Sequence, residues 1–224
     1  MQFDVLYRPA HSMARVLLGP NESVLAESGA MIGMSSHVQM QTQSGGMLSG
    51  LKRMFGSESF FRNTFTAAGA PGEVLLAHAL CGDMRVLEMT QAGYLLQSSA
   101  FIASTPNIQI DTTMGGFRGF FSGAGMFVLK ATAPSPGLLL VGGFGGIEEL
   151  YCDGTLMIDT GHLVAWDATL EYTVGKSGSG WIASFLSGEG LACHFKGQGR
   201  IWIQSRNAAE YGGAVGRLLP PRQS

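Results

Sequence analysis

The sequence predicts a single all-β domain built from short strands. Gly contributes 33 of the 224 residues, hydrophobic residues make up 46% and charged residues only 13%. This composition suits many strands joined by tight turns better than it suits solvated helices. In addition, two short patterns each occur three times along the chain, which indicates tandem copies of one structural unit. A chain of this length is within the range that closed or sandwiched β domains occupy.

The first repeated pattern is an apolar run, a tight turn and a second apolar run. The leading runs lie at 24–26, 94–96 and 156–158. Small or hydroxylated residues follow each run, where the chain must turn. We therefore expect a strand, a turn and a strand at three places: Ser28-Gly29-Ala30-Met31-Ile32-Gly33, Ser98-Ser99-Ala100-Phe101-Ile102-Ala103 and Thr160-Gly161-His162-Leu163-Val164-Ala165.

The second repeated pattern shares the same period. Its copies lie at 55–61, 121–127 and 186–192, and each is followed by a further expected strand, at 73–77, 138–141 and 200–204. The two patterns together predict one domain, 1–224, made of three units with these bounds: about 2–77, 78–141 and 142–205. Because one unit cannot bury its own apolar face, we expect the three to pack around a pseudo-threefold axis with one continuous core.

The tail at 206–224 carries the clearest helix signal. Asn207 can cap a short Ala-rich helix, and Pro220 and Pro221 would end it. We expect a helix there, or a frayed tail.

Several segments resemble one known family over nearly the whole chain. They are Ser28-Gly29-Ala30-Met31, Gly50-Leu51-Lys52-Arg53, Gly56-Ser57-Glu58-Ser59-Phe60-Phe61, Asn63-Thr64-Phe65, Pro71-Gly72-Glu73-Val74, Asp159-Thr160-Gly161-His162-Leu163-Val164-Ala165-Trp166 and Ser187-Gly188-Glu189-Gly190-Leu191. At these residues the chain resembles the mitochondrial biogenesis (altered inheritance of mitochondria) family of fungi and its bacterial relatives of unknown function.

The resemblance implies three fused TRAP-like repeats, similar to those of the tryptophan-regulated RNA-binding attenuation protein. Each repeat would be a short double-stranded β-helix or sandwich, and assembly into a ring or trimer is a common outcome for that fold. The resemblance supplies no catalytic residue, and it does not imply binding of tryptophan or RNA.

Charge, cysteines and hydropathy exclude several classes of protein. The net charge is -2 and no basic stripe is present, so we expect no nucleic-acid partner. Cys81, Cys152 and Cys193 are too few and too widely spaced for a disulfide framework or a zinc site, and we expect them to be buried. The first residues do not read as a secretory signal, and no apolar run approaches the about 20 residues that span a bilayer. We expect a cytoplasmic protein.

Motifs for nucleotide binding and acyl transfer are incomplete. Val174-Gly175-Lys176-Ser177 has Leu170 where a phosphate-binding loop needs its first glycine. The glycine run at 142–146 lacks the helix and acidic residue of a dinucleotide site and predicts a turn between repeats. Ser122 and Ser187 each follow a phenylalanine by two positions, where a nucleophile elbow needs glycine.

His162 is the most attractive single residue, because Asp159 could orient its imidazole for metal binding or proton transfer. The matching positions in the other units hold alanine and the other histidines lack ligand spacing, so a hydrogen-bonded structural histidine is favoured. Glu58 and Glu189 occupy matching positions, but the third is Ala124. That favours turn chemistry over a carboxylate pair. We expect no catalytic residue, no cofactor and no metal.

Three glycine-rich apolar segments, at 45–55, 115–121 and 178–186, form the candidate interaction surface. If the pseudo-threefold relation holds, they emerge at one end of the domain, and an exposed apolar patch of that kind marks an interface. Two alternatives remain open, capping of the core and burial within a homotrimer. The candidate residues are Met47, Leu48, Leu51, Lys52, Arg53, Met54, Phe117, Arg118, Phe120, Trp181, Ile182 and Phe185.

The sequence favours a non-enzymatic assembly, scaffold or protein-interaction protein. Low charge and high apolar content predict a homo-oligomer, either a trimer or a larger ring. A protein partner or peripheral contact with a membrane surface could use the apolar segments. The alternative is a small-molecule-binding module with its ligand near Trp166 or Trp181, and an enzyme of unknown chemistry is less favoured.

Overall fold

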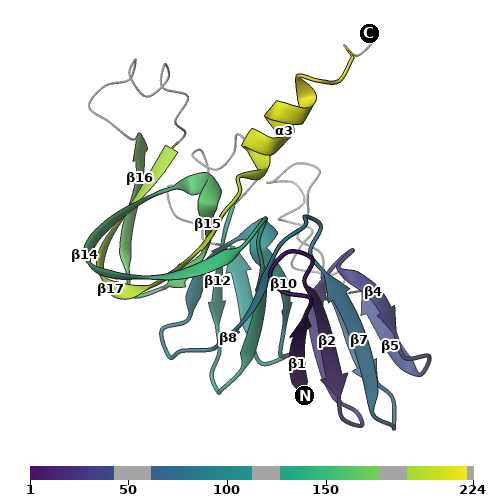
Figure 1. The fold of residues 1–224 in the computed structure, drawn as a ribbon. Coiled ribbons are helices and arrows are strands. Elements are labelled where there is room, and N and C mark those ends of the chain that lie inside the picture. Colours follow the sequence, from purple (N-terminus) through teal and green to yellow (C-terminus); the bar gives the residue numbers. More distant parts are fainter. Residues whose placement is uncertain (43–61, 113–126, 177–190, 221–224) are drawn as a thin grey trace.

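The computed structural model describes residues 1–42, 62–112, 127–176 and 191–220, and it confirms an all-β architecture (Figure 1). Strands make up most of these residues. Two single-turn 3₁₀ helices, η1 (Ser98–Ala100) and η3 (Thr160–His162), lie at the turns of the first repeated pattern. A C-terminal helix projects away from the curled sheets (Figure 1).

Residues 1–42 and 62–77 form seven strands in two layers. In one layer β7 pairs with both β2 and β4, and in the other β6 pairs with both β3 and β5, all antiparallel. Alternate residues of β2 and β6 are buried, as expected of strands with one face on a core. The strands are β1 (Gln2–Leu6), β2 (Met13–Leu18), β3 (Ser23–Glu27), β4 (Met31–Met34), β5 (Val38–Thr42), β6 (Arg62–Ala67) and β7 (Gly72–Ala77).

Residues 84–142 form six strands with a matching set of pairs. Here β13 pairs with β8 and β10, and β12 pairs with β9 and β11. The strands are β8 (Met84–Glu88), β9 (Tyr94–Gln97), β10 (Phe101–Ser104), β11 (Gln109–Thr112), β12 (Val128–Thr132) and β13 (Leu138–Gly142).

Residues 147–204 use two long strands where the earlier parts use four shorter ones. β14 (Ile147–Asp159) and β17 (Leu191–Gln204) pair along their whole length and curl together at the left of Figure 1. The second half of β17 also pairs with β15 (Leu163–Asp167), and its first half pairs with β16 (Glu171–Lys176).

Two junctions join these three parts into continuous sheets. β3 pairs with β10, where Ala26 lies opposite Ala103, and β9 pairs with β15, where Leu96 lies opposite Ala165. Both junctions are antiparallel. They produce a six-stranded sheet of order β5-β6-β3-β10-β13-β8 and a seven-stranded sheet that contains β11-β12-β9-β15-β17-β14.

The buried side chains form three clusters, so the expectation of one continuous core is wrong. The six-stranded sheet separates the first two clusters, because its strands β10 and β13 bury side chains on both faces. Ile102 and Leu140 belong to the first cluster, whereas Phe101 and Leu139 belong to the second. The third cluster fills the curl of β14 and β17 around Trp166.

The C-terminal helix lies where the sequence predicts it. α3 spans Ala208–Gly216, and the Asn207 side chain accepts hydrogen bonds from the backbone N–H groups of Ala209 and Glu210. These bonds satisfy two donors that a helix start leaves unpaired. The ring of Tyr211 packs edge-on against Phe144, with 5.2 Å between centroids, and ties the helix to the loop before β14.

Gly93 tests the turn between β8 and β9. Its φ is +79°, and a Cβ there would lie 2.2 Å from the carbonyl oxygen of Ala131. We expect Gly93→Ala to lower the free energy of unfolding by more than about 2 kcal/mol in urea denaturation, because strain and a backbone collision add. Gly29→Ala is the control, since Gly29 also has positive φ but open space around it. Equal losses for the two variants would contradict this account.

Candidate functional site

All twelve residues of the candidate interaction surface lie outside the described residues, as do Glu58, Ala124 and Glu189. The strands that border the three segments are described. Thr42 lies opposite Asn63 at the end of β5, Thr112 lies opposite Leu129 at the end of β11, and Lys176 lies opposite Leu191 at the end of β16. Each segment thus connects the two strands of an antiparallel pair.

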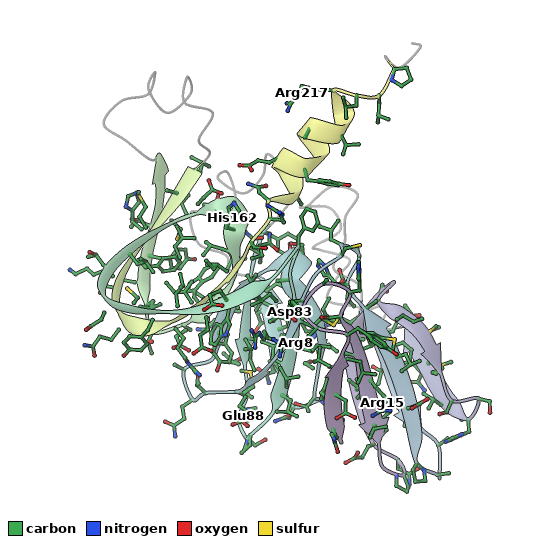
Figure 2. The ribbon with its side chains drawn as sticks, in the orientation of Figure 1. Arg8, Arg15, Asp83, Glu88, His162 and Arg217 are labelled. Carbon is green, nitrogen blue, oxygen red and sulfur yellow. The ribbon has the colours of Figure 1, made fainter. Side chains whose placement is uncertain are left out.

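His162 is held by a backbone carbonyl, and Asp159 has a different partner. Its Nδ1 lies 2.7 Å from the carbonyl oxygen of Gln204, and it lies close to the start of α3 (Figure 2). Asp159 instead accepts a hydrogen bond from the backbone N–H of Gly161 at 2.8 Å and caps η3. The geometry supports the structural role that the sequence favours for this histidine.

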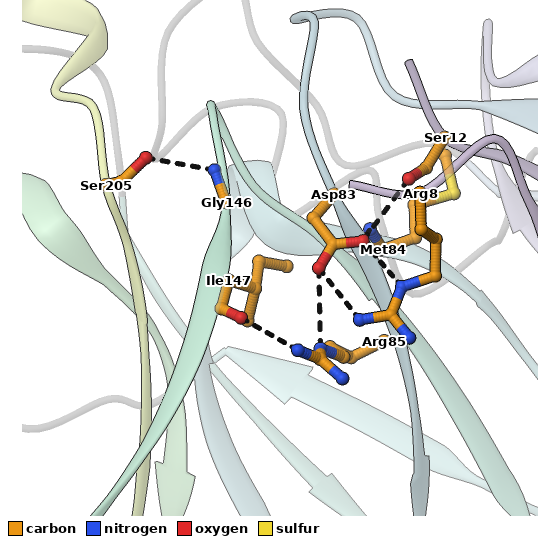
Figure 3. A network of polar contacts seen from close by, with 8 residues as sticks. All are labelled: Arg8, Ser12, Asp83, Met84, Arg85, Gly146, Ile147 and Ser205. Carbon is orange, nitrogen blue, oxygen red and sulfur yellow. Dashed lines mark hydrogen bonds and ion pairs between the residues drawn. The ribbon is translucent and has the colours of Figure 1, made fainter. Parts of the chain in front are cut away.

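Gln204 completes this corner. Its amide oxygen accepts a hydrogen bond from the Phe144 N–H at 2.9 Å, and its amide nitrogen donates to the Gly161 carbonyl at 2.9 Å. Beside it, Ser205 accepts from the Gly146 N–H (Figure 3). These bonds fix the turn at 142–146, which the sequence correctly predicts between β13 and β14.

The most concentrated charge among the described residues centres on Asp83, which sequence reasoning missed. Asp83 is 1% exposed, yet its carboxylate accepts hydrogen bonds from Arg8 Nε at 2.8 Å and Arg8 Nη2 at 3.0 Å (Figures 2 and 3). It also accepts from Ser12 and from the Met84 N–H, and Arg85 Nε lies 3.5 Å away. Arg85 in turn donates to the Ile147 carbonyl.

The cations control the ionisation of Asp83. Burial disfavours its charged form, but the hydrogen bonds from Arg8 and Met84 and the charges of both arginines outweigh burial and hold the pKa of Asp83 below its ordinary value. Because the carboxylate is ionised and fully paired at neutral pH, it is poorly suited to general acid or base work. It links the β1–β2 loop, the start of β8 and the start of β14.

A second ion pair joins β15 to β17. Asp167 accepts a hydrogen bond from the Arg200 N–H at 2.8 Å, and the Arg200 guanidinium lies 3.4 Å from the same carboxylate. Arg200 also donates to the Tyr94 hydroxyl at 3.0 Å and lies over the Trp202 ring, 5.1 Å from its centroid. These contacts cross the β9–β15 junction and are structural.

Trp166, one of the two tryptophans proposed to border a ligand, is buried in the third core cluster, and Trp181 lies outside the described residues. The Trp166 ring packs edge-on against Tyr172 and Phe195, with centroids 5.3 and 5.7 Å away. A groove of about 410 Å³ lies nearby on β14, β16 and β17, and its lining includes Met157, Thr173 and His194. Its lining also includes the ionisable side chains of Glu171, Tyr172 and Lys196.

The cysteines match their expectation in two of three cases. Cys152 and Cys193 are buried, and burial raises the pKa of the Cys193 thiol to about 12, which makes it a poor nucleophile. Cys81 is exposed, so its expected burial is wrong, because it lies in the loop just before β8. Within the described ranges no three His, Cys, Asp or Glu side chains gather as a metal site. No described helix is long and apolar enough to cross a membrane.

Comparisons with known proteins agree with this fold. A family model described as mitochondrial biogenesis AIM24 matches residues 3–206. The chain belongs to this family. An uncharacterised protein of Streptococcus pyogenes is 30% identical over 231 residues, which cover 98% of this chain and 92% of that protein. A crystal structure of a Streptococcus pyogenes protein has a TM-score of 0.81 and 29% identity, and the match covers 97% of this chain and 99% of that one.

Membership of the AIM24 family confirms the resemblance found in the sequence. Its bacterial relatives named here carry no stated activity, so the family supplies a fold and leaves the function to be argued from this chain.

Asp83 provides a test of the charged network. Asp83→Ala should lower the free energy of unfolding by about 3 to 5 kcal/mol, because it leaves Arg8, Ser12 and the Met84 N–H without their acceptor and removes the negative charge that Arg85 faces. Asp4→Ala is the matched control, since the Asp4–Arg15 pair at 2.9 Å is more exposed and its loss should cost much less. Chemical denaturation measures both. Similar small losses would show that the Asp83 network does not hold these segments together.

The carboxyl group of Glu27, at the end of β3, should make the stability of the folded protein depend on pH. Burial raises its pKa from 4.5 to about 7. The folded protein therefore keeps a proton that the unfolded chain has lost, and stability should fall as pH rises from about 4.5 to about 7. The loss is on the order of 2 to 3 kcal/mol.

Glu27→Gln should flatten this part of the profile. Gln97 already occupies the matching position in β9, where it donates to the Thr160 carbonyl across the β9–β15 junction. Urea denaturation from pH 5 to pH 8 measures the effect, with Glu210→Gln on the exposed helix α3 as a control for the loss of one negative charge. An unchanged slope in Glu27→Gln would contradict the assignment to Glu27.

Proposed function

We propose that this protein is a non-enzymatic scaffold built from three TRAP-like repeats and that it acts by contacting other proteins. The proposed repeats are 2–77, 78–141 and 142–205, joined in succession along the chain. Support comes from the strand pairing. In each repeat the same two three-strand groups recur, and successive repeats join through a pair in the same register. The scaffold is proposed to be a homo-oligomer, a trimer or a larger ring.

The observation that carries the contact surface is the common position of the three apolar segments. Each connects the strands of one antiparallel pair, β5–β6, β11–β12 or β16–β17, and these pairs correspond to one another in the three repeats. We propose that these three matching connections, each of which carries Met, Phe, Leu or Trp in its sequence, form one kind of contact surface three times, since exposed apolar patches mark interfaces. Lys52, Arg53 and Arg118 add positive charge beside them. The proposed occupant is a protein, and a membrane surface is an outcome of the test.

A cytoplasmic location belongs to the same proposal. Its support is that all three cysteines, Cys81, Cys152 and Cys193, are free, as is usual in a reducing compartment.

The structure favours this scaffold over a small-molecule module. Trp166 lies inside a core cluster, where Tyr172 and Phe195 cover its ring. The groove of about 410 Å³ lies on an outer set of strands within one repeat, not between two. A ligand held between repeats beside Trp166 would have to displace close-packed aromatic side chains.

The test replaces Met47, Leu48, Leu51 and Met54 with Ser. If the segment contacts a partner, the variant should melt within a few degrees of the parent yet lose cross-linked protein partners in the source cell, because exposed substitutions cost about 0.5 kcal/mol or less. Sedimentation with anionic lipid vesicles reports membrane contact separately. The matched control carries four Ser substitutions at exposed apolar positions elsewhere, Tyr7, Met40, Tyr151 and Leu218. A collapse of the melting temperature in the first variant alone would mean that the segment caps the core.

A further inference from the structure

The two internal junctions follow one rule of register. Ala103 lies opposite Ala26 and Ser104 opposite Leu25 where β10 meets β3. Ala165 lies opposite Leu96 and Trp166 opposite Leu95 where β15 meets β9. When the copies of the first repeated sequence pattern are aligned, Ala103 matches Ala165 and Ala26 matches Leu96. The two junctions therefore pair the same positions of the pattern. At each junction, the strand that follows the turn of one copy (β10 or β15) pairs with the strand that precedes the turn of the previous copy (β3 or β9).

A local irregularity repeats as well. β10 and β15 each carry a register shift against their other neighbour, at Ile102 and at Val164. β4 carries the same shift at Ile32, against β7. Because a bulge re-aims the strand that contains it, β4 has the backbone form of the two strands that make junctions. At its free side, no described strand pairs with β4.

The other end of the molecule offers the complementary edge. The stretch Leu156–Asp159 of β14 matches β3 and β9 in the repeated pattern, and among the described strands its sole partner is β17. β4 lies at the right of Figure 1, whereas β14 curls at the left, so the two edges lie at opposite sides of the molecule in this view.

Side chains that are buried at the two internal junctions are exposed at the matching positions of β4 and β14. Ile102 and Val164 are 0% exposed at the two junctions, whereas Ile32 in β4 is 54% exposed. Leu25 and Leu95 are 7% and 8% exposed, whereas Met157 in β14 is 54% exposed.

Met34 follows the same pattern, with 37% exposure where Ser104 and Trp166 have 0%. The positions that a neighbouring repeat buries inside the chain are therefore uncovered at both of its ends.

We propose that the β4 edge of one copy pairs with the Leu156–Asp159 edge of another, head to tail. The register follows from the internal junctions, with Gly33 opposite Ile158 and Met34 opposite Met157 of the neighbouring copy. The inference deepens the homo-oligomer of the proposed function by naming its surface and partner. A heterologous contact of this kind builds a ring where the rotation closes and a filament where it does not.

The chemistry of the two edges fits a strand partner better than solvent. An exposed edge strand offers unpaired N–H and C=O groups, and proteins that keep such edges single usually place Lys, Pro or inward charges on them. Met31-Ile32-Gly33-Met34 and Leu156-Met157-Ile158-Asp159 contain neither Lys nor Pro, and the carboxylate of Asp159 accepts a hydrogen bond from the Gly161 N–H of its own turn. Both edges carry methionine, whose flexible side chain packs well against another apolar surface.

The experiment is disulfide trapping between two single-cysteine variants in a Cys81→Ser background, which removes the exposed native thiol while Cys152 and Cys193 stay buried. Met34→Cys mixed with Met157→Cys should give a covalent dimer on mild oxidation, because opposite Cα atoms in antiparallel strands are about 4.5 to 5.5 Å apart and a disulfide spans that distance. Each variant oxidised alone should stay uncrosslinked, since the contact is head to tail.

Met34→Cys mixed with Tyr151→Cys is the matched control. Tyr151 is 65% exposed on the same strand as Met157 but six residues away, about 20 Å along the strand. We expect at least a tenfold lower yield of dimer from this mixture. Equal yields, or a dimer of Met34→Cys with itself, would overturn the head-to-tail register.

Light scattering of the Cys81→Ser parent separates this inference from the wider proposal. If the parent is oligomeric and the Met34→Cys and Met157→Cys mixture does not crosslink, the homo-oligomer stands and this edge contact is wrong. If the parent is monomeric at 100 μM, both are wrong, whereas partner capture by the three apolar segments is measured independently. Ile32→Lys should reduce an oligomeric parent to monomers, and Tyr151→Lys should leave its mass unchanged.

Discussion

Main-chain pairing across two short junctions holds this molecule together. Where β3 meets β10 and β9 meets β15, the backbone N–H and C=O groups of buried strands find partners that no single part of the chain supplies. Residues on both sides of the junctions are almost fully buried, and β9 and β10 are buried along their whole length. Each junction therefore converts two separate sheets into one sheet with a core on each face.

Charged side chains reinforce this arrangement at places where the sheets do not join. The Asp83 carboxylate accepts hydrogen bonds from Arg8 and Ser12 of the β1–β2 loop, and Arg85 extends the network by donating to the carbonyl of Ile147. A buried carboxylate is costly unless its charge is paired and its oxygens are hydrogen-bonded, and both conditions are met here. In a chain with so few charges, one buried acid thus connects segments that lie about 75 and about 60 positions apart in sequence.

Sequence patterns predicted some features of the candidate site and missed others. The sequence favoured a structural role for His162, because its matching positions are alanine, and the backbone contact to Gln204 agrees with that. The Asp83 network was missed because Arg8, Ser12 and Asp83 show no local spacing and converge through a loop and a strand start that are far apart in the chain. The apolar segments were found by their repeated composition, and their contacts stay a proposal.

By itself the sequence determined the strand content and the capped C-terminal helix. Each depends on local physics: the alternation of apolar residues in β2 and β6, glycine at turns, and the Asn207 side chain at the first turn of α3. Only the tertiary structure decided that the core divides into three clusters and that, among the described strands, β4 pairs with β7 alone and the end of β14 with β17 alone. Those outcomes depend on which strand lies beside which, and hydrogen-bonded neighbours such as β3 and β10 are separated by more than 70 residues that the local pattern does not relate.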